Sequence, residues 1–569
     1  MKSCACLLNK VFARVSCAAL ALLVVVFFAA LGAALLPAFG GTATADSAGG
    51  AGAINAAGVV RAALFTVKQA ACSTLIALAL GFPAAFFLSQ RKFAGERFLS
   101  ALAAVPLAFP ALLLAIGFVS VFGLNGAAVK LFSLTGARTA QMPYLYSFYG
   151  IIIAQGCYNF PYIMKNVSDA WEKLRGEERN AAILLGAGPF RVFRTITLVQ
   201  LSPAILWSCV MVFLFCYFSF IIILLFGAPG TSTLEVEIFH AVRAASNIQA
   251  ASALALAETA VALCVAALLT ALQQNAEKSR GNSPWSEKKK IEGCAERIFF
   301  AALMCVIIIF LCLPVASVVV RGLNPRNLLP FIKSRGFFPA LKMTVITSGI
   351  AAFLSVTAAS AYVCALILSG SGGRGGPRRA LRFFDTLPLA VSSIVMGLGM
   401  MTLVRRGNAA VYIIARSALL WPLAFKQIFP AVSRMPDDTL RAAKLFSPSL
   451  SDAAFGIVLP ETRRAHLSAF AFCFAACAAD ASLPLMLAIP RFDTLALVTY
   501  RLAGSYRMGQ ACAAGTALIA LCACVFVLAD TAAVCRRGYG RDGQRLARPR
   551  GIPQRSFKRK AFPLKKEKS

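Results

Sequence analysis

Charged residues are scarce in this sequence, and the motifs that mark nucleotide and metal sites are missing. Only 14% of the 569 residues are charged, whereas soluble domains carry about 25%. No GxxxxGK[ST] stretch occurs, so the sequence lacks the glycine-rich loop that cradles the phosphates of ATP. The 18 cysteines form no CxxC pair, and the two histidines, His240 and His466, stand alone. The sequence therefore predicts no metal site and no bound cofactor.

Hydrophobic residues are correspondingly abundant. They make up 59% of the chain, and the mean hydropathy is +0.74. Apolar runs of about 18 or more residues recur along the whole length, which is typical of membrane-spanning helices. The sequence predicts an all-α membrane protein with about 12 transmembrane helices. The runs lie near 15–36, 63–88, 99–122, 144–164, 205–226, 251–272, 298–320, 341–368, 384–404, 410–429, 467–489 and 511–534. The first run is interpreted as an uncleaved helix rather than a signal peptide.

The positive charge is concentrated in alternate loops, and the intervening loops are poorer in Lys and Arg. The formal net charge is +34, and the tail after the last run carries 13 Lys/Arg against two acidic residues. Loops with such an excess are cytoplasmic, which predicts that both termini lie inside the cell. The pattern favours contact with anionic lipids over nucleic-acid binding. We expect a first six-helix half at 1–272, a cytoplasmic linker at 273–297, a second half at 298–534 and a basic cytoplasmic tail at 535–569.

Two long basic loops, before the fifth and eleventh runs, repeat each other without a gap. Every matched pair in this region is separated by 261 positions, and an earlier pair, Pro106 with Gly117 and Pro388 with Gly399, repeats at 282. Each half has six spans, an even number, so both halves begin on the same side of the membrane. The repeat is therefore parallel, with its axis along the membrane normal. The matched residues are Ala181-Ala182 with Ala442-Ala443, Gly186 with Ser447, Leu198 with Leu459, and Ser219 with Asp480.

The pattern Ala-Ala, three residues, Gly, then Leu twelve residues later resembles the "EAA" loop of ABC importer permeases. In that family the loop forms a short coupling helix that docks on an ATPase subunit. The copies here depart from the pattern, because Asn180 and Arg441 replace the leading Glu. Ser447 replaces the glycine of the second copy, and the Leu-Pro ending is kept at Leu459-Pro460 but not after Leu198.

The stretches around the loops resemble the fused permeases of the iron(III)/thiamine class. They include 176–179, 233–239 (Thr-Leu-Glu-Val-Glu-Ile-Phe) and, in the second half, 494–500 and 504–507. The last two favour thiamine over iron. The resemblance implies two tandem six-helix type I (MetI-like) permease domains in a bacterial inner membrane. It also implies two separate ATPase subunits, a periplasmic or lipid-anchored solute-binding protein, a small solute such as thiamine, and no enzymatic activity in this chain.

Two alternatives remain at this point. The first is a permease of the same architecture for iron(III) or another small solute. The second is an ion-coupled secondary transporter, which needs no ATPase and leaves the matched loops without a role.

The solute path is sought among polar residues inside the apolar runs. Ser219 and Asp480 occupy matched positions in the fifth run of each half, and an ionisable residue within a span is costly and therefore a functional candidate. Asp480 either contacts a cationic solute or makes a contact between helices or at a helix end, and both interpretations stay open. Glu258, in the sixth run, is expected to have a structural role.

Overall fold

The computed structural model describes the chain as an assembly of helices. It covers residues 2–39, 56–102, 109–123, 126, 145–174, 176–227, 232–278, 288–291, 293–368, 387–404, 407–447 and 449–535. Within these ranges the strands are two dipeptides, β1 (Arg91–Lys92) and β2 (Lys289–Lys290), which pair in parallel. The expected basic tail lies outside the described residues.

The two halves present the same succession of helices. In the first half these are α1 (Lys2–Leu35), η1 (Leu36–Ala38), α2 (Ala56–Gln90), α3 (Glu96–Ala101), α5 (Ala111–Phe122), α7 (Phe148–Trp171), α8 (Gly176–Leu184), α9 (Pro189–Val192), η3 (Phe193–Thr197), α10 (Leu198–Tyr217), α11 (Phe220–Phe226), α12 (Leu234–Arg243) and α13 (Ile248–Lys278). In the second they are α14 (Cys294–Ile307), η4 (Ile308–Cys312), α15 (Leu313–Leu323), α16 (Pro325–Ile332), α17 (Phe337–Leu368), η5 (Leu387–Ala390), α19 (Ser393–Leu403), α20 (Ala409–Ser433), α21 (Asp437–Phe446), α22 (Leu450–Ala453), η6 (Ala454–Val458), α23 (Leu459–Glu461), α24 (Arg463–Ala478), α25 (Ser482–Leu487), α26 (Leu495–Gly504) and α27 (Met508–Cys535).

The predicted runs correspond to these helices, although several are not continuous. Eight helices in the described ranges are long and apolar enough to cross a membrane. The fifth run is divided into α10 and α11, and the eleventh into α24 and α25. The described part of the ninth run contains two short helices, η5 and α19, in place of one long one. The sixth helix continues to Lys278 and the next begins at Cys294, so helix occupies part of the expected linker at both ends.

The repeat is visible in hydrogen bonds as well as in helix order. Helices α12 and α26 begin at positions 261 apart, and the first backbone amide of each is held by a threonine hydroxyl. Leu234 N donates to Thr66 Oγ1 at 3.0 Å, and Leu495 N donates to Thr344 Oγ1 at 2.8 Å. The five-residue π-helical segments η3 and η6 also begin at positions 261 apart. The two halves therefore share one three-dimensional plan.

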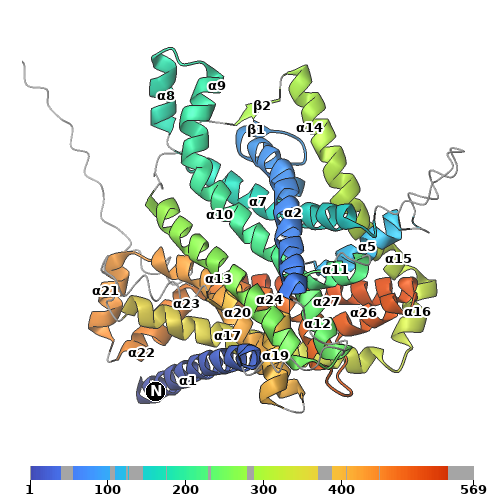
Figure 1. Cartoon of the computed structure of the whole chain (residues 1–569). Coiled ribbons are helices and arrows are strands. Elements are labelled where there is room, and N and C mark those ends of the chain that lie inside the picture. Colours follow the sequence, from blue (N-terminus) through green and yellow to red (C-terminus); the bar gives the residue numbers. More distant parts are fainter. Residues whose placement is uncertain are drawn as a thin grey trace, which may run out of the picture.

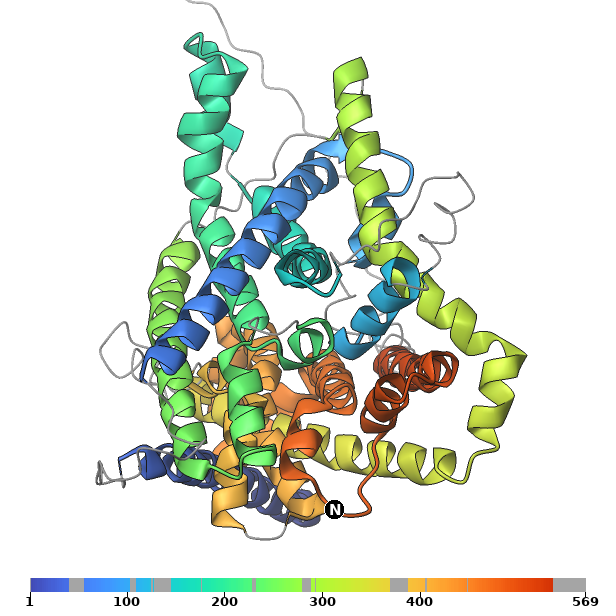
Figure 2. The same ribbon diagram turned by 45° about the vertical axis from the view of Figure 1, so that its right-hand side comes forward.

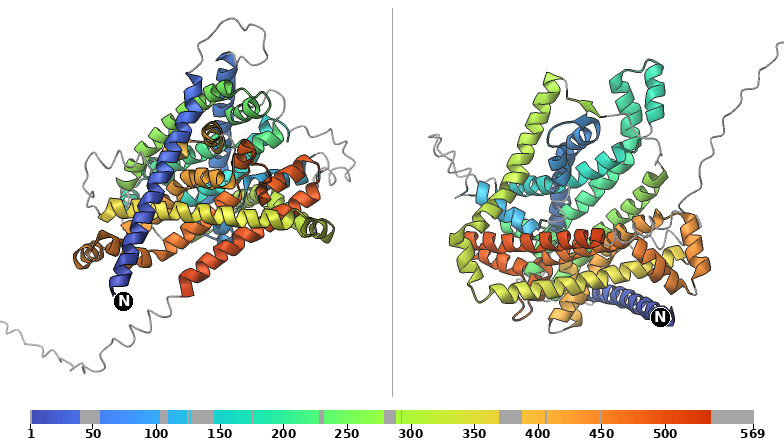
Figure 3. Two further views of the ribbon diagram at one scale, coloured as in Figure 1. Left: turned by 90° about the horizontal axis from the view of Figure 1, so that it is seen from below. Right: turned by 180° about the vertical axis from the view of Figure 1, so that it is seen from behind.

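The first helix of each half packs against the other half. Helix α1 packs across α17, α19 and α20 of the second half, and the view from below shows it crossing α17 (Figure 3). The first helix of the second half, which runs from α14 to α15, in turn packs against the first half, where α15 contacts α5 (Figure 1). The two halves are thus held together by exchanged helices and not only by a flat interface.

Glycine makes each exchanged crossing close. A Cβ atom on Gly117 would lie 2.5 Å from the carbonyl oxygen of Pro314 in the exchanged helix, and one on Gly399 would overlap the carbonyl oxygen of Ala30 in α1. The hydroxyl of Thr402 donates to the Ala33 carbonyl at 3.2 Å on the same crossing. The pair that the sequence repeats at 282 positions is therefore a pair of helix-crossing points.

The crossing predicts an unequal response to alanine. Gly399→Ala should lower the free energy of unfolding by about 1–3 kcal/mol, because backbone atoms of α1 must move away. Gly349→Ala in α17, where a Cβ atom would meet nothing within 4 Å, should be neutral or slightly stabilising. Thermal unfolding of both purified variants in detergent measures the difference. Equal midpoints would contradict the close crossing.

Candidate functional site

The first long loop is a helical hairpin that projects from the body. Helix α8 and the segment of α9, η3 and α10 form its two arms (Figures 1 and 2). Gly186 ends α8 with φ of +81°. Its amide donates to the Ile183 carbonyl and the Ala187 amide to the Ala182 carbonyl, both at 3.0 Å. This is the Schellman arrangement, which requires a left-handed residue and therefore favours glycine.

The helix of the second loop ends differently. Helix α21 ends at Ser447, which has an extended backbone with φ of −92°. A serine fits there without strain, because no left-handed conformation is needed. Leu459 and Pro460 begin the short helix α23. The helix is interrupted at Thr462, before α24 starts. In the first copy Leu198 instead opens the uninterrupted helix α10.

The small residues of the loops lie at the surface. Ala181 and Ala442 are exposed and Ala182 is half-buried, while the side chain of Ala443 lies outside the described residues. More prominent are two pairs of large apolar side chains at the tips. Leu184 and Leu185 are each 88% exposed, and their matched residues Leu445 and Phe446 are 79% and 80% exposed. The sequence analysis missed these pairs, although large apolar residues just before the turn of a charged loop were a usable signal.

The fifth helix of each half is interrupted where Ser219 and Asp480 lie. Ser219 separates α10 from α11, and Asp480 lies between α24 and α25. A break inside a membrane helix frees carbonyl groups, which need donors because lipid offers none. In the first half the donor is a neutral amide, since Gln69 Nε2 binds the Cys216 carbonyl at 2.9 Å. A neutral network of Ser73 and Gln155 lies beside it, joined by a 2.9 Å hydrogen bond.

In the second half the donor to the free carbonyl is a charged side chain. Arg416 Nη2 donates to the Ala476 carbonyl at 2.7 Å and Nη1 donates to the Ser393 hydroxyl at 3.0 Å. Nη1 also lies 3.6 Å from Asp480 Oδ2, with both side chains largely buried. Asp480 Oδ1 accepts from the Ser482 amide at 3.1 Å, at the start of α25. Asp480 thus makes both an ion pair and a helix-end contact.

Arg416 was not among the predicted site residues. It lies inside the apolar run at 410–429, and the repeat places it opposite Gln155, as it places Asp480 opposite Ser219. The second half therefore carries Arg416 and Asp480 where the first carries Gln155 and Ser219. An arginine inside an apolar run was the signal that sequence reasoning passed over.

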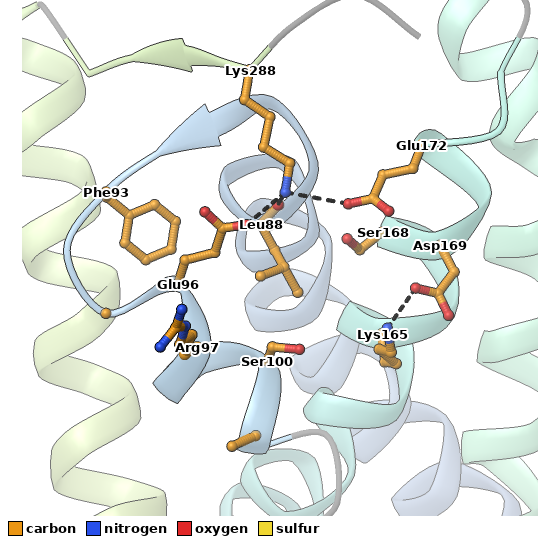
Figure 4. Close-up of a pocket in the computed structure, with 12 residues that line it drawn as sticks. Leu88, Phe93, Glu96, Arg97, Ser100, Lys165, Ser168, Asp169, Glu172 and Lys288 are labelled. Atoms are coloured by element: carbon orange, nitrogen blue, oxygen red, sulfur yellow. Dashed lines mark hydrogen bonds and ion pairs between the residues drawn. The ribbon is translucent and has the colours of Figure 1, made fainter. Parts of the chain in front are cut away.

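A separate polar pocket lies where the linker returns to the first half. It has a volume of about 880 Å³ and is lined by residues of α2, α3 and α7 (Figure 4). Lys288 Nζ reaches the Leu88 carbonyl at 2.8 Å, Glu96 at 2.7 Å and Glu172 at 3.3 Å. Burial alone would lower the pKa of Lys288, but these two carboxylates outweigh it and raise the pKa. The pocket contains none of the predicted site residues. The contacts of Lys288 hold the end of the linker beside β1.

Comparisons with known proteins agree with this geometry. Residues 77–281, from α2 past the end of α13, match the family model described as "Binding-protein-dependent transport system inner membrane component". Over 494 residues the chain is 28% identical to the thiamine transport system permease protein of Brucella abortus, covering 84% of this chain and 88% of that one. The corresponding proteins of Haemophilus influenzae and Escherichia coli are each 24% identical, covering 82% of this chain and 88% of theirs. The resemblance that the loops and their flanking stretches indicate is confirmed.

The buried pair predicts a characteristic double-mutant cycle. Arg416→Gln or Asp480→Ser alone should lower the free energy of unfolding by about 3–5 kcal/mol, because each leaves an unpaired charge. The double variant installs the chemistry of the first half, so it should recover most of that loss. Thermal unfolding of the three purified variants in detergent measures the coupling. Additive losses in the double variant would exclude a functioning pair.

Proposed function

We propose, starting from its kinship with the inner-membrane components of binding-protein-dependent transport systems, that the chain is the permease subunit of an ATP-driven thiamine importer. One observation carries the proposal. The thiamine permeases match more than four fifths of this chain and nearly nine tenths of their own length, so the likeness extends across both halves. The chain itself is a multi-pass inner-membrane protein and not an enzyme.

The two loops are the proposed contacts with ATPase subunits, one on each half. Their support is geometric, because each ends in an exposed apolar pair at matched positions, Leu184-Leu185 and Leu445-Phe446. Exposed apolar groups of this size are typical of a surface that a partner covers. The small residues Ala181 and Ala182 lie on the same helix and let a partner approach closely. On this proposal the loops, and with them both termini, are cytoplasmic.

ATP-driven closure of two such subunits would push both hairpins together. The first hairpin is continuous with α10 and the second leads into α24, and these are the helices interrupted at Ser219 and Asp480. Movement of the hairpins is therefore transmitted to the breaks that flank the proposed path. A solute-binding protein would deliver the solute at the opposite end.

An iron(III) permease of the same architecture is the second candidate. Among the described residues, no group of three or more His, Cys, Asp or Glu side chains is arranged to hold a metal ion. Thiamine is an organic cation and needs no such ligand set. An ion-coupled transporter is disfavoured by the two matched loops, which would then have no partner to contact.

The substrate proposal predicts stimulated ATP hydrolysis. The chain should be reconstituted in liposomes with the ATPase and binding protein of its own organism, and hydrolysis measured with each solute. Thiamine should raise the rate several-fold and drive uptake of labelled thiamine. Stimulation by ferric ion alone would overturn the assignment.

The loop proposal predicts a loss of assembly. The pair Leu184→Asp and Leu185→Asp should reduce co-purification of the ATPase at least tenfold, because charge then replaces the apolar contact. Gly186→Arg should also abolish transport while the protein still inserts, since its φ of +81° disfavours side chains. Asn180→Asp, an exposed change on the same helix, is the matched control and should assemble normally. Unchanged assembly of the leucine variant would exclude docking at this tip.

A further inference from the structure

Three acidic residues lie on elements that meet around the start of α19, where the two halves are in contact. Glu235 on α12 and Glu258 on α13 come from the first half, and Asp480 at the break before α25 comes from the second. Glu235 is 2% exposed and Glu258 is 1% exposed. Glu235 is an electrostatic neighbour of both Glu258 and Asp480. Ser392, at the start of α19 in the second half, lies beside both glutamates.

These glutamates are short of hydrogen-bond donors. Among the described residues, neither carboxylate oxygen of Glu258 has a hydrogen-bond partner, and Oε2 of Glu235 has none. The Ser392 hydroxyl accepts from the Val395 amide at 3.1 Å to cap α19, which leaves its one proton to be shared between the two glutamates beside it. The structural role that the sequence led us to expect for Glu258 stays a prediction, which the second test below addresses.

Only one of the three acids has an ion-pair partner among the described residues. Arg416 lies 3.6 Å from Asp480, whereas Glu235 and Glu258 are balanced by no ion pair in this part of the chain and have only the N-terminus of α19 near them. Ionising a buried carboxyl group without a partner costs several kcal/mol, and a membrane interior offers no water to offset it. A positively charged solute would supply the missing partner.

The position of the cluster suits a solute path. Glu258 lies ten residues from the start of α13 at Ile248. At about 1.5 Å per residue it is about 15 Å along the helix, which is half of a hydrocarbon core of about 30 Å. The cluster also spans the surface between the halves, so any movement of one half against the other opens or closes it.

The repeat argues against a purely architectural reason for these residues. The position matched to Glu235 is Ala496 in α26, which begins at an equivalent residue and is anchored by the same threonine contact. The second half builds the corresponding helix without a carboxylate. The acid is therefore an addition to the scaffold and not a requirement of it.

We propose that Glu235, Glu258 and Asp480 form a subsite for the positive charge of an organic monocation, such as a thiazolium ring, at the interface between the halves. This inference rests on the proposed function for the identity of the cation. A diffuse organic cation suits carboxylates that come from three separate elements and do not converge as metal ligands. Arg416 holds Asp480 in place and keeps the site from attracting more highly charged ions.

The first test labels the purified full-length chain in detergent with dicyclohexylcarbodiimide, which modifies carboxyl groups in apolar surroundings. Mass spectrometry then reads the peptides that carry Glu235 and Glu258. Thiamine should lower labelling at Glu258 at least threefold, and its neutral thiophene isostere should not. Equal labelling with and without the cation would overturn the subsite. This readout needs neither ATPase nor transport, so it stands apart from the substrate assignment.

The second test uses isosteric variants in the reconstituted importer. Glu235→Gln and Glu258→Gln should each reduce thiamine uptake at least tenfold. Glu237→Gln, two residues along the same helix, is the matched control and should leave both uptake and solute-free ATP hydrolysis unchanged. The thermal midpoint of Glu258→Gln should equal or exceed that of the unaltered chain, since an amide of the same shape replaces a buried carboxyl group that has no ion-pair partner. A fall in that midpoint would restore the structural role.

The two tests separate the possible failures. If thiamine is imported but the Glu258 variant behaves like the Glu237 control, the subsite is wrong and the proposed function stands. If organic cations protect Glu258 but no thiamine is imported, the subsite stands and the substrate assignment is wrong.

Discussion

Free carbonyl groups at two interrupted helices are the constraint on which the centre of this molecule depends. A helix that stops inside a membrane leaves carbonyls that lipid cannot satisfy, so neighbouring helices must supply donors. Gln69 does this for α10, and Arg416 does it for α24. Each solution fixes the position of the helix that carries the donor. The packing of α2 against α10, and of α20 against α24, follows from this requirement as much as from apolar contact.

The exchanged first helices place these two centres against each other. Gly117 and Gly399 allow α15 and α1 to approach the opposite half at backbone distance, which keeps the interface intact while the halves retain separate centres. The hairpins that carry the loops then lead directly into the interrupted helices. On the proposed function, a push at the hairpin tips would reach the breaks through these helices.

Much of this plan could be predicted from the sequence, and the limit has a physical cause. The apolar runs and the offset of 261 identified the spans and the repeat, because hydrophobic length and duplication leave a direct record in the sequence. The breaks after Tyr217 and Ala478 were not predicted, although Ser219 and Asp480 mark their positions, because one polar residue in an apolar run does not distinguish a helix end from a continuous helix. Arg416 and Glu235 are visible in the sequence as charged residues among apolar ones, but the groups that they face lie on other helices. The contacts of Asp480 with Arg416, and of Glu235 with the second half, depend on how the halves pack, which no local pattern specifies.

The duplication therefore supplies a scaffold whose two copies differ in charge. The first half is neutral at its break, with Gln155 and Ser219, yet it contributes the buried acids Glu235 and Glu258. The second half carries Arg416 and Asp480 at its break, and Ala496 where the first half has Glu235. A symmetric pair of charged breaks would place one ion pair in each half, and the charges of each pair would cancel. Here the single ion pair of Arg416 and Asp480 faces the buried acids Glu235 and Glu258, which are left to meet a cation. The asymmetry between the copies is thus what would turn a symmetric frame into a path selective for a cation.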